Sequence, residues 1–290
     1  MVEAGGDRTY GAQSMVAPLR VALVKRPGPA FGRAFDDAAY GFFHPVDLPA
    51  AQSEHDALCA TLRDLGVDVR FLDAETPSPD LVYTFDPALV TDRGAVLLRS
   101  GRPTRRGESD VHAAWYAAQR IPVIGRIEPP GTVDGGDTLW LDEATFCVGR
   151  TLRTNSAGIA QLTTLVGGDV RVFDVPYGEG PTKLIHLMSL ISPVAPDLAV
   201  VYLPLLPVGL WELLRERRVG LVEVPEAEFD SLGPNILAVR PGVIVMAAGN
   251  PVTAARLRQR GVEVHEVALG EVGVNGSGGP TCLTRPVLRG

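Results

Sequence analysis

The feature that most constrains this chain is a unit that recurs five times along it: a strand or a hairpin, then a helix, then a strand. Within each unit the spacing of apolar residues changes from alternation to a helical period and back to alternation. The five units are expected at residues 19–74, 87–129, 138–176, 198–226 and 236–269. Such repetition predicts one supersecondary unit used five times over.

Two architectures alternate strands and helices in this way. A doubly wound parallel sheet is one, but it does not need hairpins before its helices. The second, third and fifth units begin with hairpin patterns, at residues 87–100, 138–150 and 236–249. We therefore favour an α/β ring of five units with pseudo-fivefold symmetry, whose loops meet in a central cleft. We expect residues 1–16 to be a flexible tail and residues 17–290 a single domain.

Charge and cysteine content argue against several classes of function. The formal net charge is −7, which suits neither phosphate backbones nor anionic membranes. The most apolar region, residues 184–214, is broken by prolines and an aspartate, so we expect it in the core rather than in a membrane. The three cysteines are scattered and form no CxxC pair, which argues against a disulfide framework or a zinc site and favours the cytoplasm. No metal-binding or phosphate-binding motif occurs, so we expect no cofactor.

One cysteine stands out near the end of the chain, where GVNGSGGPTC leads a glycine-rich loop into Cys282. A nucleophilic cysteine needs an acid or base nearby. Among the histidines, His55 and His112 are predicted on helix surfaces, whereas His186 opens the apolar run LIHLMSLISPV. A histidine among apolar neighbours is costly unless it has partners. Taken singly, both His186 and Cys282 are more often ordinary core residues than catalytic ones.

Carboxylates and arginines gather where loops meet strands. VDGGD places Asp134 and Asp137 around a Gly-Gly step, and FDP places Asp86 at a strand edge. Paired carboxylates suit a cationic substrate, although both dipeptides are also common turn pairs. PTRRGE and GRTLRTN contain Arg105 and Arg153, whose guanidinium forks match carboxylates. A solvated surface charge is the usual role of a single arginine.

The order of these motifs resembles the guanidine-modifying superfamily of dimethylarginine dimethylaminohydrolases, arginine deiminases and amidinotransferases. The motifs follow one another along the chain in the order FDP, TRRGE, VDGGD, RTLRTN, LIHLMS and TCLTRP. The likeness spans about residue 19 to residue 289. It is greatest to the dimethylarginine dimethylaminohydrolase branch. The resemblance implies a five-bladed α/β propeller of the pentein type, in agreement with the five units found from the apolar pattern.

The resemblance also implies roles for particular residues. Cys282 matches the nucleophile and His186 the general acid/base. Asp134 and Asp86 match the carboxylates that hold a guanidinium group. Two arginines near the amino-acid end of the substrate complete the set, namely Arg105 or its neighbour Arg106, and Arg153.

The activity implied by the resemblance is hydrolysis of arginine or an N-methylated arginine without metal or organic cofactor. The thiolate adds to the guanidinium carbon, an amine or ammonia leaves, and the covalent thiouronium is hydrolysed to a ureido product, citrulline. The expected partner is a small guanidino molecule, not nucleic acid or membrane, and a homodimer is left open. An amidinotransferase and a catalytically silent ligand-binding protein remain alternatives. Many dimethylargininases carry an acid where this chain has Phe85, so the alkyl groups of the substrate stay unassigned.

Overall fold

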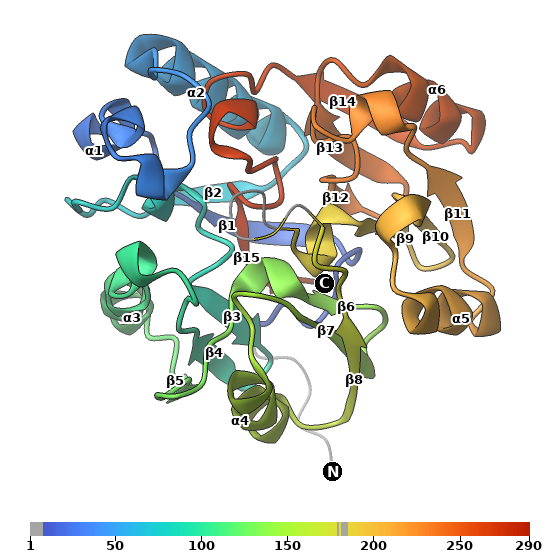
Figure 1. Cartoon of the computed structure of the whole chain (residues 1–290), viewed down its shortest axis with the longest axis horizontal. Helices are drawn as coiled ribbons and strands as arrows, with labels where there is room; N and C mark the ends of the chain where they lie inside the picture. The colour runs from blue at the N-terminus through green and yellow to red at the C-terminus, as the bar shows by residue number, and fades with distance from the viewer. Residues whose placement is uncertain (1–7, 179, 181–184) are drawn as a thin grey trace.

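Five three-stranded sheets stand around a common centre in the computed structural model, which describes residues 8–178, 180 and 185–290 (Figure 1). Each sheet has an inner strand, an antiparallel middle strand and a parallel outer strand. From inner to outer, the sheets are β15 (Arg285–Arg289), β1 (Leu19–Val24) and β2 (Asp68–Phe71); β3 (Ala88–Thr91), β4 (Gly94–Leu97) and β5 (Val123–Arg126); β6 (Thr138–Trp140), β7 (Thr145–Arg150) and β8 (Asp169–Asp174); β9 (Ile191–Ala195), β10 (Leu198–Val201) and β11 (Gly220–Glu223); and β12 (Leu237–Arg240), β13 (Val243–Ala247) and β14 (Glu263–Val267). The predicted α/β ring of five units is confirmed.

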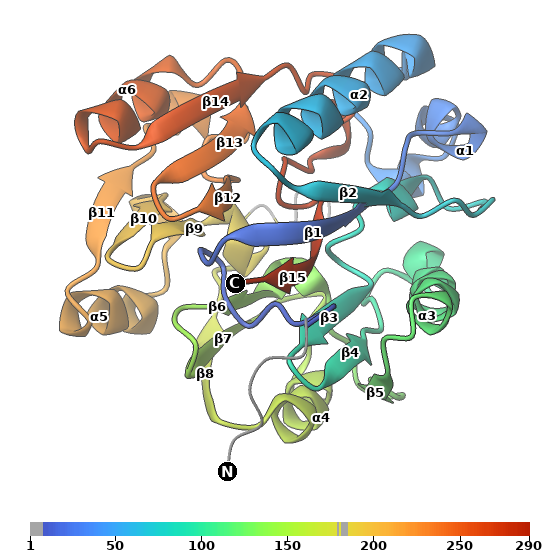
Figure 2. The same ribbon diagram turned by 180° about the vertical axis from the view of Figure 1, so that it is seen from behind.

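A helix connects the middle strand of each sheet to its outer strand and lies at the rim of the ring (Figures 1 and 2). These helices are α2 (Leu48–Asp64), α3 (Glu108–Ala118), α4 (Ser156–Val166), α5 (Val208–Glu216) and α6 (Pro251–Gln259), and a short α1 (Pro29–Gly32) precedes α2. Such a crossover connection is what lets the outer strand run parallel to the middle one. No helix within the described ranges is long and apolar enough to cross a bilayer.

Two inner strands do not appear in the predicted pattern. β15, at the end of the chain, pairs antiparallel with β1 and so completes the first sheet (Figure 2). β9 contains Pro193 and pairs antiparallel with β10. A proline in a strand is tolerated at the edge of a sheet, where its missing N–H breaks no ladder hydrogen bond. All five sheets therefore begin with an antiparallel pair.

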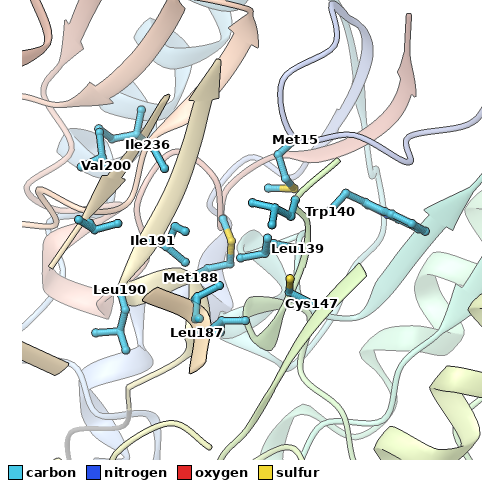
Figure 3. Close-up of a cluster of buried hydrophobic side chains, with 14 of the residues drawn as sticks. Met15, Leu139, Trp140, Cys147, Leu187, Met188, Leu190, Ile191, Val200 and Ile236 are labelled. Atoms are coloured by element: carbon cyan, nitrogen blue, oxygen red, sulfur yellow. The ribbon is translucent and has the colours of Figure 1, made fainter. Parts of the chain in front are cut away.

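The core fills the spaces between neighbouring sheets. Leu139 of β6 is buried close to Leu187, Met188 and Ile191, which come from the chain just before and within β9 (Figure 3). Met15 joins the same cluster from outside the five sheets. Because this packing joins successive sheets, the loops at the centre rest on a rigid frame.

The N-terminal segment is better ordered than predicted. Residues 1–7 lie outside the described residues, but residues 8–16 pack against the ring. Gly11 donates its N–H to the carbonyl of Val287 in β15, at 2.8 Å, and Met15 is buried. The expectation of a flexible tail over residues 1–16 is therefore wrong for its second half, because apolar side chains there complete the core.

The helix histidines also differ from the prediction, since both are fully buried. His55 of α2 lies 3.6 Å from Cys59 through its Nδ1 atom, and neither ring nitrogen of His112 in α3 has a partner among the described residues. Burial lowers the pKa of His55 to about 4 and the pKa of His112 to about 3. Arg285 and Arg105 lower the pKa of His112 further.

These histidines should make the protein sensitive to mild acid. An unfolded chain protonates histidine near pH 6.5, so between that pH and the lowered values the unfolded state binds more protons than the folded state. The free energy of unfolding should therefore fall as pH falls, by about 1–2 kcal/mol per histidine between pH 6.5 and pH 5. Urea unfolding at several pH values measures this. A His112→Phe variant should show a shallower pH dependence, and an unchanged slope would contradict the explanation.

Candidate active site

Cys282 follows the glycine-rich loop and precedes β15, with its side chain partly exposed. The loop passes very close to Tyr83: a Cβ atom added to Gly276 would lie 1.9 Å from that side chain, and one added to Gly278 would lie 2.3 Å from it. Only glycine permits such an approach. The side-chain amide of Asn235 donates to the Cys282 sulfur at 3.1 Å. The close approach to Tyr83 thus explains why the loop before Cys282 contains glycine at these positions.

The thiol of Cys282 is held in its protonated form. Burial, and then the carboxylate of Asp86, raise its pKa to about 12, against the opposing effect of the Asn235 hydrogen bond. Thiolate is the nucleophilic form of cysteine. A cation placed beside Asp86 would lower this pKa, because it would offset the negative charge that faces the sulfur.

Asp86 follows the 3-10 helix η3 (Pro79–Val82) and precedes β3. Its Oδ1 accepts the N–H of Gly136 at 2.9 Å, and its Oδ2 lies 2.5 Å from the Arg105 guanidinium. Burial raises the pKa of this carboxyl, but Arg105 and His186 outweigh burial and bring the pKa below its ordinary value. Asp86 is therefore a carboxylate aimed at the site.

Phe85 is buried away from the site rather than beside it. Its ring lies under the guanidinium of Arg285, with the Cζ atom 3.8 Å from the ring centroid. Its N–H donates to the carbonyl of Cys282 at 3.1 Å. Phe85 therefore contacts the backbone of Cys282 from behind, and its ring does not line the pocket where a ligand would bind.

Arg105 is fully engaged by protein groups. Its guanidinium pairs with Asp86 and with Glu108, whose Oε2 lies 2.8 Å away, and its NH2 group faces the carbonyls of Asp80 and Tyr83 at 3.2 and 3.4 Å. The side chain is buried. No edge of this fork is left for the carboxylate of a small molecule.

Arg102 lies three residues earlier and is more accessible, with 22% of its side chain exposed. It donates to the Asp80 carboxylate at 3.0 Å and to the Tyr40 carbonyl at 3.1 Å. Arg106, the alternative weighed in the sequence, is exposed and does not line the pocket. Sequence reasoning missed Arg102, although it belongs to the same arginine-rich loop.

Asp134 is fully buried behind Arg153. Its Oδ1 accepts the N–H of Gly101 at 3.1 Å, and its Oδ2 lies 3.4 Å from the Arg153 guanidinium. The same Arg153 nitrogen lies 3.5 Å from Nε2 of His186, which is itself 4.0 Å from Asp134. A guanidinium from the protein thus lies where Asp134 and His186 could hold the guanidinium of a ligand.

His186 has a second carboxylate on the other side of its ring. Its Nδ1 lies 3.1 Å from Oδ1 of Asp137, close enough for an ion pair. Asp137 is held in turn by the hydroxyls of Thr151 and Thr154, at 2.7 and 2.6 Å, and by the N–H of Leu187 at 3.1 Å. Sequence reasoning noted Asp137 beside the Gly-Gly step but gave it no role. The same VDGGD motif was the signal for it.

The two carboxylates decide the charge of His186. Burial lowers the pKa of this histidine, but Asp137 and, more weakly, Asp134 outweigh burial, so the pKa is raised above its ordinary value. The ring can therefore hold a proton near neutral pH. With Nδ1 turned to Asp137, Nε2 is the atom that can exchange a proton with a ligand.

These groups meet in a cavity of about 170 Å³. Among its lining residues are Asp86, Arg102, Arg105, Arg153, His186 and Cys282. Five of the six residues predicted for the site thus line one pocket, and the sixth, Asp134, lies directly behind it. No cluster of metal-ligating side chains occurs in the part of the chain that the structure describes. The pocket combines a thiol, an acid/base and carboxylates, which is a set able to attack a bound cation covalently.

Comparison with known proteins gives consistent matches. The family model for arginine deiminase matches residues 73–206 and 206–289. An arginine deiminase of Listeria welshimeri is 30% identical over 76% of this chain, which spans 63% of that relative, and an N(G),N(G)-dimethylarginine dimethylaminohydrolase of Pseudomonas aeruginosa is 29% identical over 82% of this chain and 89% of that relative.

Solved structures share the fold. A mutant DDAH of Pseudomonas aeruginosa complexed with citrulline superposes with a TM-score of 0.79 at 24% identity, covering 92% of this chain and 99% of that one. The N-terminal domain of the cyanobacterial arginine dihydrolase ArgZ, covalently bound to a reaction intermediate, gives 0.79 at 18% identity, covering 93% and 98%. At these identities the likeness concerns the fold alone.

Proposed function

The chain belongs to the arginine deiminase family, and from that premise we propose that it hydrolyses the guanidino group of arginine or an N-methylated arginine. The observation that carries the proposal is a single pocket in which Cys282, His186 and Asp86 meet, with Asp134 directly behind. The expected products are an amine or ammonia and a ureido compound. The named relatives act on such substrates, and the side chains of this pocket suit the same chemistry.

Binding begins with the cationic end of the substrate. A guanidinium carbon is a weak electrophile because its charge is delocalised, so orientation matters more than binding strength. Asp86 and Asp134 hold the guanidinium group of the substrate. For this, the side chain of Arg153 moves away from Asp134, and the guanidinium of the substrate takes its place. Orientation of this kind is worth roughly 7–11 kcal/mol in well-aligned cases. The arriving cation also offsets the charge of Asp86, which favours the Cys282 thiolate.

The chemistry then proceeds in two halves. The Cys282 thiol loses its proton to water as the cation binds, and the thiolate adds to the guanidinium carbon. The carbon–nitrogen bond to the departing amine then breaks, and His186 gives that amine its proton. This leaves a thiouronium on Cys282. His186 next removes a proton from water, the hydroxide adds to the same carbon, and the carbon–sulfur bond breaks to release the ureido product. One histidine serves as acid and then as base.

Product analysis tests the proposal. The native protein is incubated with arginine, monomethylarginine, asymmetric dimethylarginine and agmatine, and products are identified by mass spectrometry. We expect a ureido product from at least one of the first three. An amidino group appearing on an added amine, with no ureido product, would favour a transferase. Neither product from any of the four compounds would refute the proposal.

The charge of Asp86 should control the reactivity of Cys282. An Asp86→Asn variant loses the anion that raises the thiol pKa and leaves the positive charge of Arg105 in place. We expect iodoacetamide to alkylate Cys282 several-fold faster in this variant at pH 8, while turnover is lost. Asp110→Asn, an exposed change on α3, is the control. Slower alkylation in Asp86→Asn would contradict the assignment.

Arg102 should bind the carboxylate of an amino-acid substrate. Arg102→Gln removes an accessible fork at the pocket, whereas Arg105 is already engaged. We expect KM for arginine to rise about 10- to 100-fold with a smaller change in kcat, because loss of a charge-assisted hydrogen bond costs about 1.5–3 kcal/mol. If agmatine, which lacks the carboxylate, is turned over, its KM should hardly move. Equal effects on both compounds would exclude this role.

A further inference from the structure

A second cavity lies on the other side of η3 from the Cys282 pocket. It has a volume of about 310 Å³ and is formed by the connection that follows β1 and the connection that follows β2, which we call the β1–β2 cavity. Its apolar lining includes Phe31, Leu72 and Val82, all of them buried. The rest of the lining is polar, so that about half of the cavity surface is apolar and half polar. A concave space of this size, with apolar walls and several polar groups, can hold a small molecule.

A lysine at this cavity has unused binding capacity. The half-buried Lys25 donates to the carbonyl of Ala74 at 2.6 Å and, at 3.4 Å, to that of Leu72, which leaves one N–H of its ammonium group uncommitted. Within residues 8–178, 180 and 185–290, no carboxylate comes within ion-pair distance of it. Lys25 is therefore a partly desolvated cation with no carboxylate in direct contact among the described residues. The neighbouring Arg26 is already held by Asp56 through two hydrogen bonds.

Negative charge lines the same cavity. Burial lowers the pKa of Lys25, and the exposed carboxylates of Glu75 and Asp73, which line the cavity, offset part of that lowering. The site thus offers one cation, two anions and an apolar floor. An α-amino acid with an aliphatic side chain has the complementary groups: a carboxylate for Lys25, an ammonium group for Asp73 and Glu75, and a hydrocarbon chain for the floor.

The cavity is connected to the Cys282 pocket by hydrogen bonds. Ser78 lines the cavity, and its hydroxyl donates to Oε1 of Glu108 at 2.6 Å. Glu108 pairs with Arg105, which pairs with Asp86 in the Cys282 pocket. Every one of these side chains is buried. The chain of contacts is short, and each link is a polar group that would be costly to leave unpaired.

The wall between the two cavities is a single turn of helix. Pro79 and Val82 of η3 line the β1–β2 cavity, whereas Asp80 of the same turn and Tyr83 just after it line the Cys282 pocket. A ligand packed against one face of this turn fixes the position of the other face. Both the turn and the polar chain thus join the two cavities.

We propose that the β1–β2 cavity binds an α-amino acid with an aliphatic side chain, and that its occupation strengthens ligand binding in the Cys282 pocket. A filled cavity holds η3 and Ser78 in place, which fixes Glu108 and Arg105 and so orients Asp86. By reciprocity, a ligand in the Cys282 pocket strengthens amino-acid binding to the same degree. Coupling between sites typically changes affinity by about 5- to 150-fold.

Calorimetric titration of the full chain with L-leucine tests the binding. We expect saturable binding of one L-leucine per chain, and much weaker binding of 4-methylpentanoic acid and of isoamylamine, each of which lacks one of the two charged groups of leucine. Lys25→Met should abolish binding, whereas Arg33→Gln, an exposed change outside the cavity, should not. If Lys25→Met does not fold, the Asp73→Asn/Glu75→Gln pair tests the other end of the ligand and should weaken binding.

The coupling is tested with a second ligand present. Titrating L-leucine into Cys282→Ser with and without saturating L-arginine should show at least about a fivefold difference in Kd, and Ser78→Ala should bind L-leucine without that difference. The proposal is overturned if no L-leucine binds up to about 10 mM. It is also overturned if binding survives in Lys25→Met, if binding depends on Arg102, or if L-arginine leaves the Kd unchanged. L-leucine binding to the native chain does not depend on whether the protein proves to be a hydrolase.

Discussion

Cys282→Ser is expected to reduce turnover at least about 10,000-fold, because Cys282 is the nucleophile in the proposed mechanism and its loss would remove the covalent route. A serine hydroxyl has a far higher pKa than a thiol, and His186 is not positioned by any contact seen here to deprotonate it. Rapid quenching and mass spectrometry of the intact chain should detect an amidino adduct on the native protein during turnover. No such adduct should form on the variant.

The matched control uses a cysteine that lies elsewhere. Cys59 is buried in α2 and does not line the pocket, so Cys59→Ala should change stability but leave kcat near that of the native protein. The Cys282→Ser variant should keep native thermal stability, because its side chain fills nearly the same space. An active Cys282→Ser variant, or an adduct that forms on another residue, would mean that the covalent step has been assigned to the wrong group.

The ring could be predicted from sequence because each unit carries its own apolar period, but two of its strands could not. β15 pairs with β1 from the opposite end of the chain, and no local pattern reports a partner so distant. β9 contains Pro193, which reads as a strand breaker until the strand is known to lie at the inner edge of its sheet. Local sequence patterns therefore predict most helices and strands of the five units, whereas the strands β9 and β15 become recognisable only from the strands with which they pair.

The site shows the same division. Motif order selected residues that meet at one pocket, but it could not say which neighbouring side chain faces which partner. Arg102 precedes one turn of 3-10 helix, η4 (Pro103–Arg105), and Arg105 ends it. That turn buries Arg105 among carboxylates and leaves Arg102 more accessible at the pocket. Asp134 and Asp137 are separated by two glycines, and the sharp turn between them sends their carboxylates to opposite sides of the His186 ring.

Asp137 is therefore the subject of the second large prediction. It positions His186 through an ion pair to Nδ1, which fixes Nε2 as the atom that meets the ligand. In Asp137→Asn the histidine loses the charge that stabilises its protonated form and the partner that sets its tautomer. We expect kcat to fall about 10,000-fold, by analogy with the effect of removing the same charge from other histidine–carboxylate pairs. Thr151→Val removes one of the hydroxyls that hold Asp137 and should cause a much smaller loss.

The pH profile separates this role from a merely structural one. Because Asp137 outweighs burial and raises the pKa of His186, its removal should lower that pKa. In the proposed mechanism the leaving amine takes its proton from His186, so the basic limb of the residual kcat profile should move to lower pH in Asp137→Asn. Asp142→Asn, an exposed change on the turn between β6 and β7, should leave the profile unchanged. A general loosening of the fold would lower kcat at every pH without moving the limb, and a profile of native shape in Asp137→Asn would thus show that the carboxylate does not tune the histidine.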